Sequence, residues 1–254
     1  MNRLRRALKS RMEKGIVDFR MIRPGDRIAV GVSGGPDSLS LLNLLLDGFG
    51  YATNDFTLVA VHIDMGFAHP GGKRNRDLLE GHFRDLRVNY RIVQTAIAEE
   101  ILPPKARKNP CFVCSLLRRK AVYEAADSEK CNKIAYGHHQ DDIVETLLLN
   151  ILYGRKIGTM YPVQPVFRNR FTLIRPFVYI EEAQLKRFAA QSRLPLTQRL
   201  CPMDGNTRRQ RVKEMIALLQ RTERFANIRK NIFKSLYHME LEDFNTIRSS
   251  SDFA

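Results

Sequence analysis

The stretch Val30–Leu39, which reads VGVSGGPDSL, constrains the fold of this 254-residue chain more than any other. The β-branched run Arg27–Val32 predicts a short buried strand, and the apolar run Leu39–Leu46 predicts a helix. Between them, Gly34 and Gly35 can adopt positive φ and let backbone N–H groups approach an anion. The helix that follows directs its positive end toward the same point. The sequence therefore predicts a strand, a phosphate-binding turn and a helix.

The polar residues of this turn narrow the type of phosphate site. Candidate phosphate-binding residues are Ser33, Gly34, Gly35 and Ser38. Asp37 is a candidate for both nucleotide binding and catalysis. The turn lacks the Gly-Lys-Ser/Thr ending of a Walker P-loop and the GxGxxG spacing of a dinucleotide fold. SGGPDS instead resembles the PP-loop of the ATP pyrophosphatases, which split ATP into AMP and pyrophosphate. The alternative is an ordinary helix cap in which Asp37 only complements the helix dipole.

Charge points to a polyanionic partner. Lys and Arg number 42 against 27 Asp and Glu, which gives a formal net charge of +15. Nucleic acid is favoured over a membrane surface, because the basic residues are scattered and the chain has no Trp for an interfacial anchor. No apolar run has the length of a membrane span, and the N-terminal residues lack the apolar core of a signal peptide. We expect a cytoplasmic protein that binds no membrane.

Alternating strand and helix patterns predict the fold class. A basic amphipathic helix at 2–20 precedes the first strand, and strands at 56–64 and 90–94 flank a helix at 73–86. This order predicts an α/β fold with a doubly wound, mostly parallel sheet, an N-terminal helix and a helical C-terminal extension. The predicted divisions are 1–24 for the basic helix, 25–176 for a nucleotide-binding domain with an inserted CxxC segment, and 177–254 for the helical C-terminal region.

Two further strand ends supply candidate nucleotide-binding residues. His62 and Asp64 end the strand at 56–64, and Gly137 and His138 follow a strand predicted at 132–136. In open parallel sheets, ligands bind at the carboxyl ends of the strands. We therefore expect these four residues to flank the nucleotide.

Carboxylates open the next predicted helix, at 141–152. Asp141 and Glu145 are four residues apart and so lie on one helix face, where they could hold Mg²⁺ and orient ATP. Asp141 is accordingly a candidate catalytic residue. Acidic residues also belong in the first turn of any helix, and Asp142 to Glu145 has the form of a capping box. This motif taken alone leaves the two interpretations open.

The four cysteines are too few for a disulfide scaffold, so metal binding or catalysis is the expected use of the CxxC motif. CxxC is compatible with half a zinc site, a redox dithiol or part of an iron–sulfur site. Cys111 and Cys114 form the motif, and Cys201 is the distant partner. Three such thiols could hold three irons of a [4Fe–4S] cluster and leave the fourth open. Cys131, beside a strand, is expected to be a core residue.

A helix predicted at 115–126 follows the motif. Arg118, Arg119 and Lys120 would lie in its first turns, where they oppose the helix dipole. That placement predicts a compensating negative charge, either thiolate or RNA phosphate. The basic proline-rich run at 101–110 is expected to be an irregular loop.

Several motifs in fixed order resemble one family. They are SGGPDS, CFVCSLLRR, GHHQDDIVETLL, GRKIGTMYP, LIRPF and a late LCPMDG, and they span roughly residues 25–220. Together they look like the tRNA 2-thiocytidine biosynthesis proteins, PP-loop enzymes that install sulfur on a cytidine of the tRNA anticodon loop. The family's late motif has a second cysteine where this chain has Asp204. That departure leaves three cysteines for the cluster and makes Asp204 or an external group the fourth ligand.

The resemblance implies cofactors, partners and residue roles. ATP would bind at the PP-loop with Mg²⁺ near Asp37 and Asp141, and a [4Fe–4S] cluster would rest on Cys111, Cys114 and Cys201. The base oxygen would be adenylated and then replaced by sulfur, with Arg118 screening negative charge or gripping the tRNA. The sulfur donor and the modified base stay undefined, and a homodimer is left open.

Two other functions compete with this one. A related PP-loop enzyme could thiolate a tRNA uridine or make lysidine, since these enzymes share the PP-loop and, for lysidine, the HHxDD pattern. A zinc-stabilised basic RNA-binding protein without catalysis is an alternative of another class. It would leave the phosphate turn without a role.

Overall fold

The computed structural model describes residues 3–103, 110–202, 207–223 and 227–236. The chain forms two compact units. The first comprises residues 1–142 and 160–206, and the second comprises residues 143–159 and 207–254. The three divisions predicted from sequence remain a prediction.

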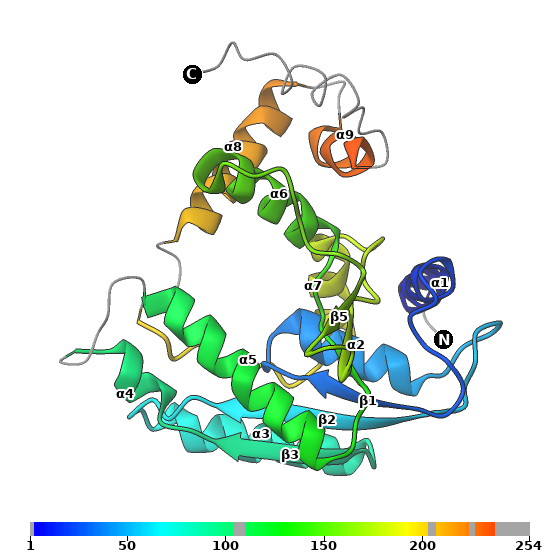
Figure 1. The fold of residues 1–254 in the computed structure, drawn as a ribbon, viewed down its shortest axis with the longest axis vertical. Helices are drawn as coiled ribbons and strands as arrows, with labels where there is room; N and C mark the ends of the chain where they lie inside the picture. Colours follow the sequence, from blue (N-terminus) through cyan, green and yellow to red (C-terminus); the bar gives the residue numbers. More distant parts are fainter. Residues whose placement is uncertain (1–2, 104–109, 203–206, 224–226, 237–254) are drawn as a thin grey trace. The chain divides into compact units, whose positions relative to one another are not determined.

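The first unit contains a six-stranded sheet whose order is β3-β2-β1-β4-β6-β5 (Figure 1). Neighbouring strands are parallel except for β5, which is antiparallel to β6. This arrangement confirms the predicted doubly wound, mostly parallel α/β fold. The strands are β1 (Asp26–Gly31), β2 (Phe56–Asp64), β3 (Asn89–Gln94), β4 (Lys133–Ala135), β5 (Val163–Val166) and β6 (Phe171–Ile174).

The sequence patterns did not predict β5. Its four residues carry a glutamine and a proline and show no clean apolar alternation. Pro165 cannot donate a ladder hydrogen bond, which suits the edge position that β5 occupies.

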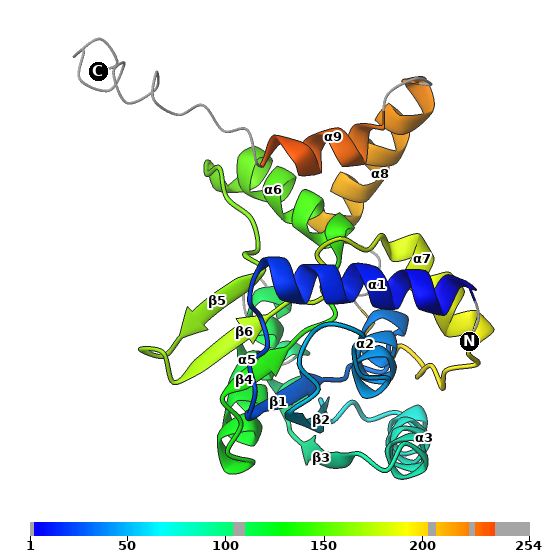
Figure 2. The same ribbon diagram turned by 90° about the vertical axis from the view of Figure 1, so that its right-hand side faces the viewer.

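Helices cover both faces of the sheet. Figure 2 shows α2 (Pro36–Leu46) and α3 (Gly71–Asp85) on one side and α5 (Pro110–Ser128) on the other. On the α5 side, Val122 and Ala126 pack against Val59 and Ile134 of the central strands. From β1 to β3 the strands are added toward one edge of the sheet, and β4 is added on the other side of β1. The strand order therefore reverses between β1 and β4. That reversal is where open α/β sheets bind ligands.

Three further helices complete the first unit. The N-terminal helix α1 (Arg3–Asp18) forms as predicted, and its apolar stripe is buried through Leu8, Met12 and Ile16. The short helix α4 (Ile97–Ile101) was not predicted. A reciprocal capping box between Glu181 and Gln184 begins α7 (Glu182–Gln191). None of the helices in the described ranges combines the length and hydropathy that crossing a bilayer requires.

Helix α5 starts earlier than the sequence pattern indicates. It begins at Pro110 rather than Ser115, and Pro110 suits a first turn because proline's missing N–H is unneeded there. Cys111 therefore lies in the first turn and Cys114 directly after it. Arg118 is the ninth residue of the helix, beyond the first turn where the dipole acts, so the expectation that it opposes the helix dipole is wrong.

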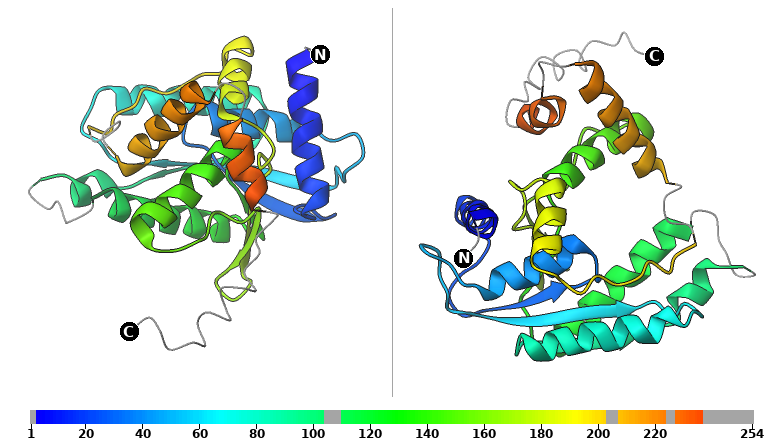
Figure 3. Two further views of the ribbon diagram at one scale, coloured as in Figure 1. Left: turned by 90° about the horizontal axis from the view of Figure 1, so that it is seen from above. Right: turned by 180° about the vertical axis from the view of Figure 1, so that it is seen from behind.

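The second unit is helical in its described residues. Helix α6 (Gln140–Gly154) enters it at Ile143, and α8 (Arg208–Thr222) and α9 (Ile228–Ser235) follow after the first unit. Figure 3 shows α8 and α9 side by side in orange and red. Val212 and Ile216 of α8 and Phe233 of α9 are buried. The Thr207 side chain caps α8 by accepting a hydrogen bond from the Gln210 N–H.

Candidate active site

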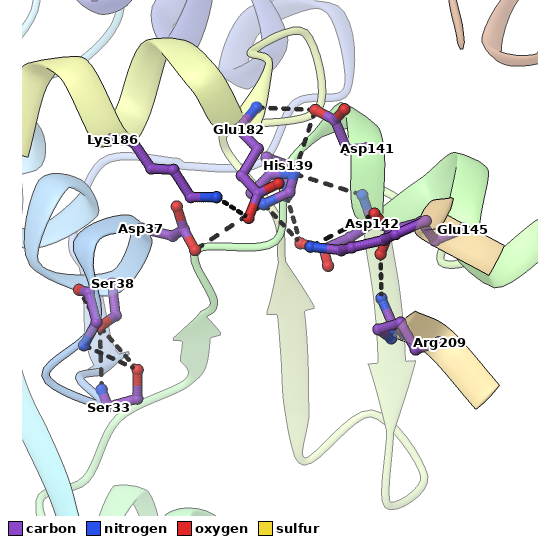
Figure 4. A network of polar contacts seen from close by, with 12 residues as sticks. Ser33, Asp37, Ser38, His139, Asp141, Asp142, Glu145, Glu182, Lys186 and Arg209 are labelled. Carbon is purple, nitrogen blue, oxygen red and sulfur yellow. Dashed lines mark hydrogen bonds and ion pairs between the residues drawn. The ribbon is translucent and has the colours of Figure 1, made fainter. Parts of the chain in front are cut away.

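The turn after β1 is closed by its own hydroxyl groups. The Ser33 N–H donates to Ser38 Oγ at 3.0 Å, and Ser38 Oγ donates to the Gly35 carbonyl at 3.2 Å (Figure 4). Gly34 adopts a φ of +84°, which side-chain-bearing residues rarely adopt. A Cβ at position 34 would lie 2.2 Å from Thr197 Oγ1, and the Thr197 N–H donates to the Gly34 carbonyl at 3.0 Å. The predicted turn is therefore held from within and by the segment after α7.

The loop after β4 packs directly against this turn. A Cβ at Gly137 would lie 2.9 Å from both the carbonyl carbon and the carbonyl oxygen of Asp37. Both segments follow the carboxyl ends of the adjacent parallel strands β1 and β4. The structure thus brings two of the predicted motifs together at the point where the strand order of the sheet reverses.

His139 lies among carboxylates beside the turn (Figure 4). Its ring is 3.9 Å from the Asp37 carboxylate, 3.6 Å from Asp141 and 3.4 Å from Asp142. The backbone N–H of Glu182, at the start of α7, donates to Asp141 Oδ2 at 2.8 Å. The backbone N–H of His139 donates to the Asp142 carboxylate at 3.1 Å. Asp37 and Asp141, which the sequence nominated, therefore lie beside one histidine, although they are 104 positions apart in the chain.

The electrostatics of Asp37 favour a positively charged ligand. Burial raises the pKa of Asp37, and the charges of Asp142 and Glu182 raise it further, while His139 and Lys186 lower it. Within the described residues, Asp37 Oδ1 is buried without a hydrogen-bond partner. An orphaned carboxylate oxygen among other carboxylates fits the oxygen ligands that Mg²⁺ prefers. No three His, Cys, Asp or Glu side chains in the described ranges are already arranged to hold a metal ion.

We expect Asp37→Asn to stabilise the fold at neutral pH. The pKa of Asp37 is raised in the folded state, so folding favours its protonated form. The resulting stability is fully present below the unfolded pKa of about 3.9, and it is lost as the pH rises through the folded-state pKa. The amide avoids that loss, so Tm should rise, by roughly 2–4 °C for each kcal/mol gained in a chain of this size. Calorimetry across this pH range should show the difference from wild type growing with pH. A lower Tm for the variant at neutral pH would contradict a raised pKa of Asp37.

His62 has a defined protonation state. Its Nδ1 lies 2.8 Å from the Val32 carbonyl, which can only accept, so Nδ1 carries the proton. Burial lowers the pKa of His62, which keeps the ring neutral at pH 7. His62 therefore braces β2 against the beginning of the phosphate turn, and its contact with nucleotide stays a prediction.

Asp64 has structural partners of its own. Its carboxylate forms an ion pair with Arg76 of α3 and accepts a hydrogen bond from the Gly66 N–H at 3.0 Å. These contacts order the connection between β2 and α3. The nucleotide-binding role that the sequence suggested for Asp64 remains a prediction.

Arg175 holds His138 from the end of β6. Arg175 is buried, and its Nε donates to His138 Nδ1 at 3.3 Å. Its guanidinium also donates to the Tyr161 carbonyl. In this hydrogen bond His138 Nδ1 is the acceptor. The LIRPF motif thereby contributes a residue to the same edge of the sheet.

The three predicted cysteine ligands act on one another electrostatically, although in the described residues they are not arranged to hold a metal ion. Cys111 and Cys114 lie within the first five residues of α5. Cys201 follows a segment anchored to α3 by Asn75, which exchanges two 2.9 Å hydrogen bonds with the backbone of Gln198. Burial raises the pKa of the Cys114 thiol, and the charges of Cys201 and Cys111 raise it further. All three thiols are free. Three thiols are, by their chemistry, a donor set that fits an iron–sulfur cluster. Asp204, the fourth predicted ligand, lies outside the described residues.

Arg118 connects the cysteines with the nucleotide-binding edge. It lies one turn after Cys114, and its charge and hydrogen bond lower the pKa of that thiol. Its charge also lowers the pKa of His62. Its role in stabilising a thiolate or a substrate phosphate stays a prediction.

Four residues of this arrangement were missed as individual candidates. They are His139, Asp142, Glu182 and Thr197. His139 and Asp142 stand inside the GHHQDD motif, whose adjacent members were chosen instead. Glu182 and Thr197 carry no local signal, because only the return of α7 and the following segment to the sheet brings them to the turn.

Comparisons with known proteins find relatives along most of this chain. A family model described as a PP-loop domain matches residues 4–219. The tRNA-cytidine(32) 2-sulfurtransferase of Pelobacter propionicus is 40% identical over 235 residues, which cover 91% of this chain and 85% of the relative. The enzyme of the same name from Syntrophotalea carbinolica is 37% identical and is covered to 96%, as is this chain.

A solved structure shares the fold. It is the U34-tRNA thiolase of Methanococcus maripaludis with its [4Fe–4S] cluster, which superposes with a TM-score of 0.74 at 22% identity. The match covers 93% of this chain and 80% of that one.

Proposed function

Because the chain belongs to the PP-loop domain family and, within it, to the family of the tRNA-cytidine(32) 2-sulfurtransferases, we propose that it is an ATP-dependent tRNA sulfurtransferase that replaces the 2-oxygen of an anticodon-loop cytidine with sulfur. One observation of the structure carries this proposal beyond the family relationship. The phosphate turn, the His139 carboxylates and the three thiols all belong to the first unit, and Arg118 acts electrostatically on both the thiol of Cys114 and His62.

The first half-reaction activates the base. The phosphate turn binds the ATP triphosphate through backbone N–H groups and the hydroxyls of Ser33 and Ser38. Asp37 and Asp141 would hold Mg²⁺, which when bound would neutralise phosphate charge. The cytidine 2-oxygen attacks the α-phosphorus, and pyrophosphate leaves. Catalysis by this chain consists of positioning the two reactants and neutralising charge on the phosphates.

The second half-reaction exchanges oxygen for sulfur. A sulfur nucleophile attacks the activated C2, and AMP departs with the original oxygen. Cys111, Cys114 and Cys201 would hold an iron–sulfur cluster, which when bound supplies an open iron site for sulfur. Arg118, which favours the thiolate of Cys114, would also stabilise negative charge on the departing AMP.

Nucleoside mass spectrometry of tRNA from cells with and without this protein tests the proposal. We expect 2-thiocytidine to be lost in its absence and restored by the wild-type gene. Loss of a thiouridine or of lysidine instead would move the assignment to a related PP-loop reaction. Unchanged modification, with stoichiometric zinc and no ATP-dependent pyrophosphate release in the presence of tRNA, would support a non-catalytic RNA-binding protein.

A further inference from the structure

The described part of the second unit is strongly basic. Its residues 143–159, 207–223 and 227–236 contain ten Lys and Arg side chains against three Glu. One of those three, Glu145, is fully buried and pairs with Arg209 and Lys213, so it does not offset the other cations. A basic surface of this kind attracts nucleic acid through its phosphates.

Ion pairs to a buried carboxylate fix the orientation of α8. The Glu145 carboxylate of α6 pairs with Arg209 at 3.2 Å (Figure 4). It also pairs with Lys213 at 3.6 Å. Arg209 also donates to Thr146 Oγ1 at 3.1 Å. Positions 209 and 213 lie on one face of the helix, because residues four apart are neighbours on its surface. This pairing commits that face of α8 to α6.

The other face of the same turns points to solvent. Arg208 and Arg211, three residues apart, are both exposed, and neither has an ion-pair partner in the described part of the chain. They lie in the first turn of α8, where the helix dipole is also positive. The arginines and the dipole add to one positive potential, which an anion would relieve.

An aromatic ring lies within this positive surface. The Arg208 guanidinium is 5.1 Å from the centroid of the Tyr153 ring, in the last turn of α6. The ring remains 45% exposed. Two exposed cations, Arg155 and Lys156, follow it directly. The Lys156 N–H donates to the Asn150 carbonyl at 3.1 Å, which anchors the loop that carries them.

We propose that Tyr153, Arg155, Lys156, Arg208 and Arg211 form an RNA-loop binding face. Tyr153 stacks on an unpaired base, and the four cations contact the phosphates on either side. Exposed aromatics between arginines are the means by which proteins bind single-stranded loops, whose bases are free to stack. The inference rests on the proposed function, because it takes the anticodon loop of the substrate tRNA as the RNA.

Binding of an unmodified tRNA transcript at several salt concentrations tests this face. Tyr153→Leu removes the ring but keeps an apolar side chain, so we expect Kd to rise about tenfold with an unchanged salt dependence. Tyr153→Phe keeps the ring and should bind within about twofold of wild type. Arg155→Ala/Lys156→Ala should lower the slope of log Kd against log salt by about one to two units.

Arg91→Ala, an exposed arginine on β3, is the matched control for the loss of surface charge and should bind tRNA as wild type does. If Tyr153→Leu and the double variant both bind tRNA like this control while the wild type binds and thiolates it, the face is wrong and the proposed function stands. If the wild type itself neither binds nor thiolates tRNA, both proposals fail. A face that instead recognised an acidic protein or anionic vesicles would leave tRNA binding unchanged in every variant.

Discussion

Replacing Cys201 by Ser should reduce tRNA thiolation on the order of 100-fold or more while ATP binding persists. Loss of one of three cluster ligands removes the metal centre, and changes even behind metal ligands cost about 10–100-fold in affinity or activity. Cys111→Ser and Cys114→Ser should behave alike. The measurement is thiolation of tRNA in vitro, together with iron and sulfide content after anaerobic reconstitution and a separate ATP-binding assay.

Cys131→Ala is the matched control for these variants. Cys131 is fully buried, and burial raises the pKa of its thiol to about 11, so it stays protonated and is a poor metal ligand at neutral pH. The control should retain iron and activity and lose only a little stability, since it removes one buried sulfur atom. Full activity and full iron content in Cys114→Ser would contradict the cluster assignment.

The fold was predictable because its signals are local. The strand at β2 is a nine-residue apolar run with the predicted bounds, and the amphipathic spacing of α1 predicted its buried face. The doubly wound sheet followed from the order of these elements, and the comparisons confirm the family that the combined motifs resemble.

Sequence patterns predicted less well the helix boundaries and side-chain partners that depend on contacts between distant segments. The start of α5 at Pro110 had no periodic signal, because the proline-rich sequence before the CxxC motif reads as a loop. Glu145 has the spacing of a partner for Asp141, yet its carboxylate pairs with Arg209 and Lys213 from 64 and 68 positions away. Sequence spacing predicts which side chains share a helix face, but it does not predict which residues from other elements contact that face.

The contact between the two loops of the candidate site also has no sequence signature, although a single substitution can test it. Gly137→Ala should raise Kd for ATP at least about tenfold and lower the thiolation rate roughly 100-fold. Its Cβ would lie 2.9 Å from the Asp37 carbonyl group, which is backbone and cannot rotate away, so the phosphate turn must shift. Misplacement by about 1 Å can cost about 100-fold in rate.

Gly81→Ala in α3 separates this clash from the general effect of adding a methyl group. A Cβ at position 81 would meet nothing within 4 Å, and alanine favours a helix interior over glycine by about 0.5–1 kcal/mol. This control should therefore melt slightly higher than wild type and keep its activity. Isothermal titration with ATP and single-turnover thiolation would compare the two variants. Wild-type ATP affinity in Gly137→Ala would show that the loops after β1 and β4 do not form one nucleotide site, because the methyl group cannot be accommodated while both keep their observed positions.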